Sequence, residues 1–309
     1  MIEKIKRKIR KYISQSLRDI TLGVANNGNL NNKMLIQNGK IWSSLLKERN
    51  IQNLSDAEFK VFSQWGDDGI IQYLINHLSI ANKSFIEFGV EDYQEANTRF
   101  LLVNDNWSGL VLDGSPENIL KIKKDEIFWK YDLRAKSAFI TAENINELIN
   151  EEGIEGEVGL LHIDIDGNDY WIWKALEVVD PIIMIVEYNS IFGSKRAITI
   201  PYSDDFYRFK AHYSGLYAGA SLKALCDLAE KKGYSFIGCN SAGNNAYFVK
   251  KGYCKDLKIL NSETGYVESK FRESRDENGN LNDKREGDRI EVIKDMPIYN
   301  TDTNQIEKI

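Results

Sequence analysis

Two short apolar runs decide the fold of this chain: Ser84–Phe85–Ile86–Glu87–Phe88–Gly89–Val90 and, further along, Gly109–Leu110–Val111–Leu112–Asp113–Gly114. Each reads as a buried parallel strand with an acidic residue and a glycine at its end. In open α/β sheets, ligands bind beyond the carboxyl ends of such strands. A glycine there lets a ligand approach the backbone, and an acidic residue after the second strand can accept both ribose hydroxyls. The two runs therefore predict a site for an adenosine-type cofactor.

The same pattern of strand and helix continues from Ser63 to Lys251. Strands are expected at Ser84–Val90, Gly109–Leu112, Ile127–Tyr131, Val158–Ile165, Ile182–Glu187, Tyr234–Cys239 and Ala246–Lys250. Helices are expected at Asp68–Leu78, Asn97–Asn104, Ala142–Glu151, Asp169–Val178 and Ser221–Lys232. The last two strands are joined by a loop too short for a parallel crossover, so they form an antiparallel hairpin. We therefore predict an α/β, Rossmann-like, doubly wound seven-stranded sheet whose last two strands are that hairpin.

Both ends of the chain differ from this central part. Met1–Leu17 has the spacing of a basic amphipathic helix, Val24–Gly39 reads as a connector, and a second helix is expected at about Lys40–Glu48. The charged stretch after Tyr253 is expected to be an appendage, with a surface hairpin and a frayed end. This predicts N-terminal helices over 1–60, a cofactor-binding domain over 61–253 and a charged C-terminal appendage over 254–309. The amphipathic helix also makes a homodimer reasonable.

Composition excludes several classes of protein. The net charge of −6 argues against a nucleic-acid binder, which needs a basic face. Three scattered cysteines suit neither a disulfide framework nor a thiolate metal cage. No apolar run approaches the roughly 18 residues of a membrane span, and no secretory signal is recognisable. These features predict a cytoplasmic protein without a membrane span.

Further motifs accompany the two strands in a definite order along the chain. They are Ser63–Gln64–Trp65–Gly66–Asp67–Asp68, Asn97–Thr98–Arg99, His162–Ile163–Asp164–Ile165–Asp166–Gly167, Val186–Glu187–Tyr188–Asn189, Pro201–Tyr202 and Gly219–Ala220–Ser221–Leu222. Together with the terminal hairpin, this set resembles class I S-adenosylmethionine-dependent methyltransferases of the FkbM-like kind. Such enzymes modify bacterial saccharides and surface glycans, including capsular polysaccharide. The resemblance covers about Val61 to Lys250.

The resemblance implies which residues hold the cofactor. Glu87 and Gly89 would lie under its amino acid part and ribose. Asp113 would hold the ribose hydroxyls, and Ser115 would lie beside the adenine. Gly114, between them, belongs to the same cofactor-binding set.

Two further cofactor positions come from later strands. Asp132, expected after the third strand, would contact the adenine amino group, and Asp164 would face the methionine end and the substrate. The chain departs from the usual glycine-rich loop at Glu91 and Tyr93, where glycines are expected. Larger side chains there narrow the approach to the backbone.

An acidic cluster at the ends of the fourth and fifth strands is the richest chemical feature. Asp164 and Asp166 alternate onto one side of an extended segment, and Glu187 ends the neighbouring strand. Such carboxylates can bind Mg²⁺, which can orient a sugar diol and acidify its hydroxyl. The alternative is structural: Asp166 or Asn168 caps the next helix, and Asp169 favours its positive end.

Candidate catalytic and acceptor-binding residues complete the set. Asp164 and His212 are the candidate catalytic residues, because His212 lies in a loop expected to face the substrate and can take a hydroxyl proton. His162 lies deeper in its strand and is expected to be a hydrogen-bonded core histidine. Acceptor-binding roles are expected for Asp166, Glu187, Tyr188, Asn189 and Tyr202.

These residues favour an S-adenosylmethionine-dependent O-methyltransferase that acts on a saccharide or related small polar acceptor in bacterial surface-glycan modification. One alternative is a metal-dependent nucleotide-sugar glycosyltransferase that uses Asp164–Ile165–Asp166 as its acidic pair. Another is a non-catalytic methyltransferase-like assembly protein.

Overall fold

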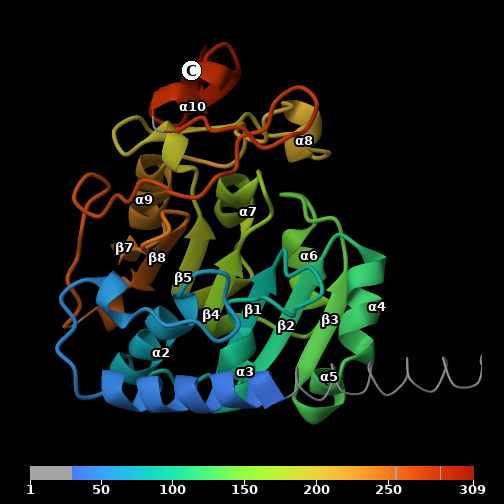
Figure 1. The fold of residues 1–309 in the computed structure, drawn as a ribbon, viewed down its shortest axis with the longest axis vertical. Coiled ribbons are helices and arrows are strands. Elements are labelled where there is room, and N and C mark those ends of the chain that lie inside the picture. Colours follow the sequence, from blue (N-terminus) through green and yellow to red (C-terminus); the bar gives the residue numbers. More distant parts are fainter. Residues whose placement is uncertain (1–29, 255, 286) are drawn as a thin grey trace, which may run out of the picture.

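The structure, a computed structural model, describes residues 30–254, 256–285 and 287–309. Its centre is one seven-stranded sheet of order β3-β2-β1-β4-β5-β8-β7 (Figure 1). The strands are β1 Ser84–Phe88, β2 Ser108–Asp113, β3 Leu133–Ser137, β4 Gly156–Ile163, β5 Val179–Glu187, β7 Tyr234–Cys239 and β8 Asn245–Lys250. Strands β1 to β5 pair in parallel, whereas β8 is antiparallel to both β5 and β7. The predicted sheet and its terminal antiparallel hairpin are confirmed.

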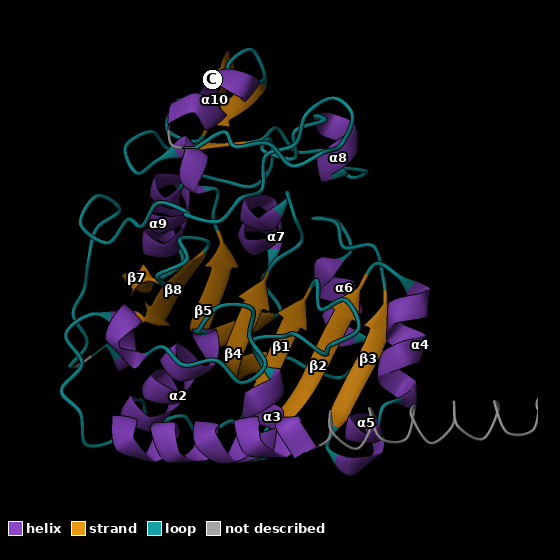
Figure 2. Ribbon diagram, viewed as in Figure 1, coloured by secondary structure: helices purple, strands orange, loops and turns teal. Residues whose placement is uncertain are grey.

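Helices cover both faces of this sheet (Figure 2). They include α2 Asp67–His77, α3 Arg99–Asp105, α4 Pro116–Lys124, α5 Glu126–Lys130, α6 Ile145–Asn150, α7 Asp169–Ala175 and α9 Leu222–Lys231. Alternate strand residues feed two separate cores: Ile86 and Phe88 join one, and Phe85 joins the other. Both faces are therefore buried, which explains why these strands read as continuous apolar runs.

The third strand was predicted in the wrong place. Ile127–Tyr131 falls largely in helix α5, whose N-cap Asp125 accepts a hydrogen bond from the Ile127 amide at 2.9 Å. The strand β3 begins at Leu133 and lies at the edge of the sheet, where only part of its surface is buried. An edge strand needs fewer apolar residues. The strand was therefore predicted at the more apolar residues of α5 instead of at β3.

The N-terminal part is more helical than predicted. A helix runs over residues 30–46, so the connector expected at Val24–Gly39 is wrong from residue 30 onward. Gly39 lies within this helix, where a Cβ would stand 2.6 Å from Val61 and 2.7 Å from Phe100. The glycine therefore permits close packing. The amphipathic helix predicted at Met1–Leu17 lies outside the described residues, so the homodimer stays a prediction.

The C-terminal segment forms a hairpin that is tied to the domain. Strands β9 Pro297–Asn300 and β10 Gln305–Lys308 pair with each other, and β9 pairs with β6 Ile198–Thr199. The expected hairpin is confirmed, and the expected frayed end is wrong. Helix α10 Gly287–Ile293 and helix α8 Arg208–Ala211 lie beyond the arrowheads of the parallel strands (Figure 1).

The remaining short helices are η1 Leu54–Ala57, η2 Ser190–Phe192 and η3 Lys251–Tyr253. Among the described residues, no helix combines the length and apolar character needed to span a membrane.

Candidate functional site

Glu87, at the end of β1, is almost fully buried and fully engaged by protein donors. Its carboxylate accepts hydrogen bonds from the amides of Asn97 (2.9 Å) and Thr98 (3.0 Å) and from the Thr98 hydroxyl. His162 Nδ1 lies 3.0 Å from Glu87 Oε1. Burial raises the pKa of Glu87, but the bond to His162 and its charge, with the Thr98 and Asn97 donors, bring that pKa below its ordinary value. Glu87 thus anchors the loop after β1.

His162 is the partner that completes this arrangement. Burial lowers its pKa, but the hydrogen bond and the negative charge of Glu87 raise the pKa above the usual histidine value. His162 is 4% exposed. It is therefore a buried, hydrogen-bonded histidine, as the sequence indicates.

Gly89 and Asp113 meet at the same edge of the sheet. Gly89 has φ +74°, and a Cβ there would lie 1.6 Å from the carbonyl oxygen of Asp164, so only glycine fits. Its amide donates to the Leu112 carbonyl at 2.9 Å. The Asp113 carboxylate accepts the Glu91 and Ser115 amides, both at 2.8 Å. Asp113 thus ties together the loops that follow β1 and β2.

The two residues that replace the expected glycines keep a glycine-like backbone. Glu91 has φ +48° and Tyr93 has φ +61°. The Tyr93 ring is buried and its hydroxyl lies 2.9 Å from Thr98 Oγ1, whereas the Glu91 side chain is exposed. The loop therefore keeps a left-handed conformation that non-glycine residues adopt rarely.

The loop after β2 leads directly into helix α4. Ser115 is the N-cap, and its hydroxyl accepts the Asn118 amide at 3.3 Å. Gly114 is exposed, and a Cβ there would lie 3.9 Å from the Phe139 ring, which is 52% exposed. Phe139 follows β3, so it is a candidate site residue that sequence reasoning missed. The misplaced third strand hid it.

Asp132 does not lie where the sequence predicted. It precedes β3, and its carbonyl accepts the amide of Gly109 near the start of β2. It therefore lies at the amino-terminal edge of the sheet, opposite Gly89 and Asp113. This placement removes the basis for its predicted adenine contact.

Asp164, Asp166 and Glu187 gather at the ends of β4 and β5. One carboxylate oxygen from each lies within 4.8 Å of the others. Burial and the charge of Asp166 raise the pKa of Asp164 to about 7. Burial and the charge of Asp164 raise the pKa of Glu187 well above its ordinary value. In the described part of the chain, no group donates a hydrogen bond to the carboxylate of Asp164 or Glu187.

The loop that carries Asp166 is shaped by Asp169. The Asp169 carboxylate accepts the amides of Ile165 (2.9 Å) and Gly167 (3.0 Å), and its burial raises its pKa to about 6. Asp166 has φ +59° and meets Arg208 Nη1 at 2.9 Å. Asp169 is thus a structural residue of this loop, and Asp166 is turned toward Arg208.

A small cavity of about 20 Å³, enough for a water molecule, opens beside Glu187. Six of the residues that line it are Glu187, Tyr188, Asn189, Arg208, Ser269 and Glu273. Its wall therefore combines the end of β5 with the C-terminal segment, which the sequence separates widely.

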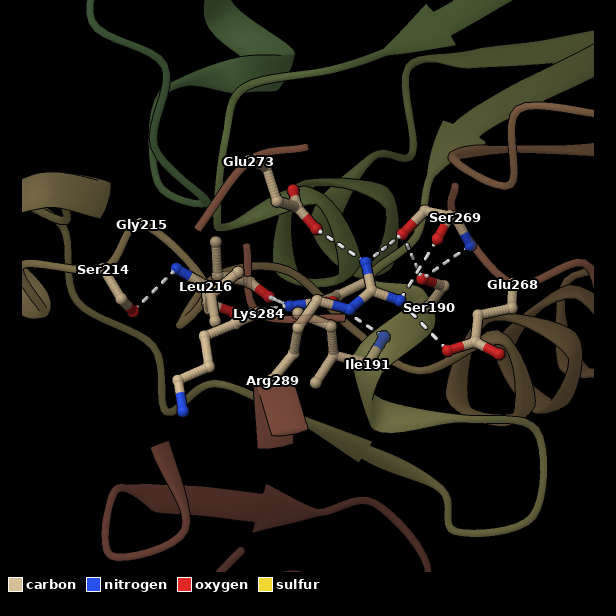
Figure 3. A network of polar contacts seen from close by, with 12 residues as sticks. Ser190, Ile191, Ser214, Gly215, Leu216, Glu268, Ser269, Glu273, Lys284 and Arg289 are labelled. Carbon is tan, nitrogen blue, oxygen red and sulfur yellow. Dashed lines mark hydrogen bonds and ion pairs between the residues drawn. The ribbon is translucent and has the colours of Figure 1, made fainter. Parts of the chain in front are cut away.

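Arg289 holds that C-terminal wall in place (Figure 3). This arginine is 3% exposed and donates to Ser269 Oγ at 2.7 Å and to Glu268 at 3.0 Å. It also meets one oxygen of Glu273 at 3.3 Å, while the other oxygen accepts from Arg208 Nη2 at 3.0 Å. The chain Arg289–Glu273–Arg208–Asp166 thus connects the wall to the acidic cluster. Local sequence signals did not reveal this.

The structure does not bring all predicted acceptor residues to this cavity. Tyr188 and Asn189 line it. Tyr202 instead donates to Glu143 at 2.5 Å and accepts the Ala142 amide at 3.0 Å. His212 Nδ1 lies 2.8 Å from Ser214 Oγ, burial lowers its pKa, and the cavity lining does not include it. The carboxylates of Glu187 and Glu273 line the cavity, and His212 does not.

The acidic cluster also fits a hard divalent cation by the number and kind of its donors. Mg²⁺ takes oxygen ligands, often one or two carboxylates with water. Asp164, Asp166 and Glu187 would supply those oxygens, and a bound ion would acidify a coordinated hydroxyl. Arg208 already neutralises part of this charge through Asp166, so it competes with such an ion.

Comparison with known proteins adds distant structural similarities. No protein-family model matches the sequence, and no curated protein matches it. One similar solved structure is an O-methyltransferase from Bacillus cereus in complex with SAH, with 14% identity, 54% of this chain and 74% of that chain covered, and a TM-score of 0.36. Another is the N-terminal domain of EvdMO1 with SAH bound, with 12% identity, coverage of 61% and 80%, and a TM-score of 0.39.

A third similar structure is an S-adenosylmethionine-dependent methyltransferase from Clostridium acetobutylicum ATCC 824. It shows 11% identity, covers 60% of this chain and 90% of that chain, and has a TM-score of 0.39. The fold assignment of this chain rests on its own strand order and pairing.

Proposed function

We propose that this chain is an S-adenosylmethionine-dependent methyltransferase. The observation that carries the proposal is the meeting of Gly89, Asp113 and Asp164 at the carboxyl edge of a doubly wound sheet that ends in an antiparallel hairpin. Ligands of open α/β sheets bind at this edge, beside the point where the strand order reverses. Here the order reverses between β1 and β4.

The proposed cofactor site runs along this edge. Gly89 and Asp113 contact the ribose, Gly114 and Ser115 lie on the adenine side, and Glu87 supports the loop from below. Phe139 takes the adenine-side place that Asp132 was expected to fill, because its exposed ring lies next to Gly114. Asp164 faces the methionine end.

The proposed acceptor is a saccharide or related small polar molecule that is methylated on oxygen. Its hydroxyl oxygen attacks the sulfonium methyl, the carbon–sulfur bond breaks, and the hydroxyl proton passes to a carboxylate. Asp164 is suited to take that proton, because its pKa of about 7 matches a working pH near neutrality. Glu187, Arg208 and Glu273 offer hydrogen-bonding partners for acceptor hydroxyls. Tyr188 and Asn189 complete the lining.

The cellular role in this proposal is modification of a bacterial surface glycan, such as a capsular polysaccharide, in the cytoplasm. Mg²⁺ at Asp164, Asp166 and Glu187 is an optional addition. Removal of divalent ions with a chelator tests it: an unchanged transfer rate would leave Asp164 as sole base, and a loss restored by Mg²⁺ would support the ion.

Titration calorimetry with S-adenosylhomocysteine tests the proposed function. We expect saturable binding at one site per chain, weakened about tenfold or more by Asp113→Ala. The control is Asp204→Ala, at an exposed aspartate in the loop after β6. Absence of binding in the wild-type protein would overturn the proposal. Radiolabelled S-adenosylmethionine with a panel of free saccharides would then identify the acceptor.

A metal-dependent nucleotide-sugar glycosyltransferase is the second candidate. The proximity of the Asp164, Asp166 and Glu187 oxygens favours it, because such an acidic set can hold a divalent ion. A thermal-shift comparison separates the two functions: UDP-sugars with Mn²⁺ would stabilise a glycosyltransferase, whereas S-adenosylhomocysteine alone would stabilise a methyltransferase. Stabilisation by neither would support a non-catalytic assembly role.

A further inference from the structure

A second cavity of about 310 Å³ lies beside the edge strand β7. Its walls come from residues 51–55, from Tyr73 of α2, from the end of β7 and from the C-terminal segment between 257 and 270. The sheet order places β7 four strands away from β1, so this cavity is separate from the proposed cofactor edge. Its volume reaches the lower end of the range for small-molecule sites, roughly 300–1,000 Å³.

The backbone preforms this cavity. A register shift between Phe236 and Gly238 interrupts the pairing of β7 with β8, and Gly238 has φ +140°. A Cβ at Gly238 would stand 3.1 Å from Leu54 Cδ1, in the space between the two walls. The Leu260 amide donates to the Phe236 carbonyl at 2.9 Å, which fastens the C-terminal segment to the strand. The C-terminal wall is therefore fixed to the strand β7 by a backbone hydrogen bond.

The lining is apolar with a few polar groups. Its apolar residues include Leu54, Ile237 and Leu260. Tyr73 also lines the cavity, and its hydroxyl reaches solvent. Within the described residues this hydroxyl makes no hydrogen bond, so it is available to a polar atom of a ligand.

Two lysines give the cavity a positive charge. Lys258 and Lys270 both line it, and neither forms an ion pair with any residue of the described ranges. This is notable because the whole chain carries a net charge of −6. Cations without partners beside an apolar surface are complementary to an amphipathic anion.

We propose that this cavity binds a small amphipathic organic anion. Its apolar body packs between Leu54, Ile237 and Leu260, and its anionic group lies near Lys258 and Lys270. A polar atom on the ligand bonds to the Tyr73 hydroxyl. The site is distinct from the proposed acceptor cavity and does not depend on the proposed methyl transfer.

The test uses 8-anilinonaphthalene-1-sulfonate as the probe, because it joins an aromatic body to a sulfonate. With the full chain at low salt, we expect a saturable rise in its fluorescence with one site per chain. The double variant Lys258→Glu/Lys270→Glu should weaken binding about tenfold or more, and added salt should reduce that difference. The matched control is Lys123→Glu/Lys124→Glu, at two exposed lysines of α4.

Two further variants keep the test sharp. Thr264→Trp places a large ring at the exposed rim of the cavity and should abolish binding, and Tyr73→Phe should weaken it about threefold or more. Circular dichroism confirms that each variant is folded. The proposal is overturned if the wild-type protein does not bind the probe, if the Lys258/Lys270 variant binds it as the wild type does, or if the α4 control weakens it equally.

Discussion

Glu87 is the next-to-last residue of β1 and Glu187 the last residue of β5 in the same sheet, but their surroundings are opposite. Glu87 accepts hydrogen bonds from Asn97 and Thr98 and pairs with His162, and its pKa is lowered. Glu187 lies beside two other carboxylates, and its pKa is raised. Burying a charge is unfavourable unless partners replace the lost water. Glu87 is thus stabilised by partners within the fold, whereas Glu187 lacks such partners, as its proposed role at the acceptor site requires.

The largest expected effect concerns the catalytic role proposed for the acidic cluster. Glu187→Gln should lower the rate of methyl transfer about 100-fold or more, because the acceptor loses a carboxyl partner beside the base. The affinity for S-adenosylhomocysteine should stay unchanged, since Glu187 is not in the proposed cofactor site. Single-turnover transfer of a radiolabelled methyl group measures the rate, and calorimetry measures the affinity. An unchanged rate would remove Glu187 from the acceptor site.

The next effect concerns Glu87, the glutamate whose carboxylate has hydrogen-bond partners. Glu87→Gln should lower the free energy of unfolding by about 4 kcal/mol, because it breaks a buried ion pair. Urea unfolding should be measured at pH 5.5. The exposed Glu117→Gln in α4 serves as the control and should change little.

The choice of pH follows from the two pKa shifts of this pair. The pKa of Glu87 is lowered, so its contribution is present above its ordinary value of 4.5 and is lost as pH falls through the folded pKa. The pKa of His162 is raised, so its contribution is complete below 6.5 and is lost as pH rises through its folded pKa. The pair should therefore contribute most between pH 4.5 and 6.5. If the loss of unfolding free energy caused by Glu87→Gln instead grew steadily above pH 6.5, that result would contradict the ion pair.

A smaller effect tests the contact between Gly89, in the loop after β1, and Asp164, which follows β4. Gly89→Ala should destabilise the protein by about 3 kcal/mol, because the added Cβ meets the Asp164 carbonyl as well as an unfavourable φ. Gly153→Ala is the matched control: φ there is +67°, and nothing lies within 4 Å of the added atom. It should cost only about 1 kcal/mol. Equal losses in the two variants would mean that the loop after β1 moves freely away from Asp164.

The sheet and the two deciding strands were predictable because their signals are local. Apolar runs followed by Gly89 and Asp113 identify buried parallel strands without knowledge of their neighbours. The helix that starts after Ser221 was equally clear, since Ser221 accepts the Ala224 amide at 3.1 Å. The edge strand β3 gave a weaker signal, because two of its five side chains are exposed. The cap at Asp125 was the sign that helix α5 precedes it.

The wall of the proposed acceptor cavity was not predictable from the sequence. Glu273 and Arg289 lie in a charged stretch that resembles a solvated surface. Their roles arise only when the C-terminal segment returns to Arg208 and Ser190, and this pairing has no local signature. The predicted roles of Asp132 and Tyr202 depended on placement in the same way, and each residue contacts a different part of the chain.

The most direct test of the contrast between Glu87 and Glu187 is the stability of Glu187→Gln as pH changes. Because the pKa of Glu187 is raised, the folded state holds a proton that the unfolded state has lost above pH 4.5, and stability falls as pH rises from there. Urea unfolding at pH 8 should therefore show Glu187→Gln to be more stable than the wild type by about 1 kcal/mol, with a smaller gain at pH 4.5. A Glu187→Gln protein less stable than the wild type at pH 8 would contradict the account.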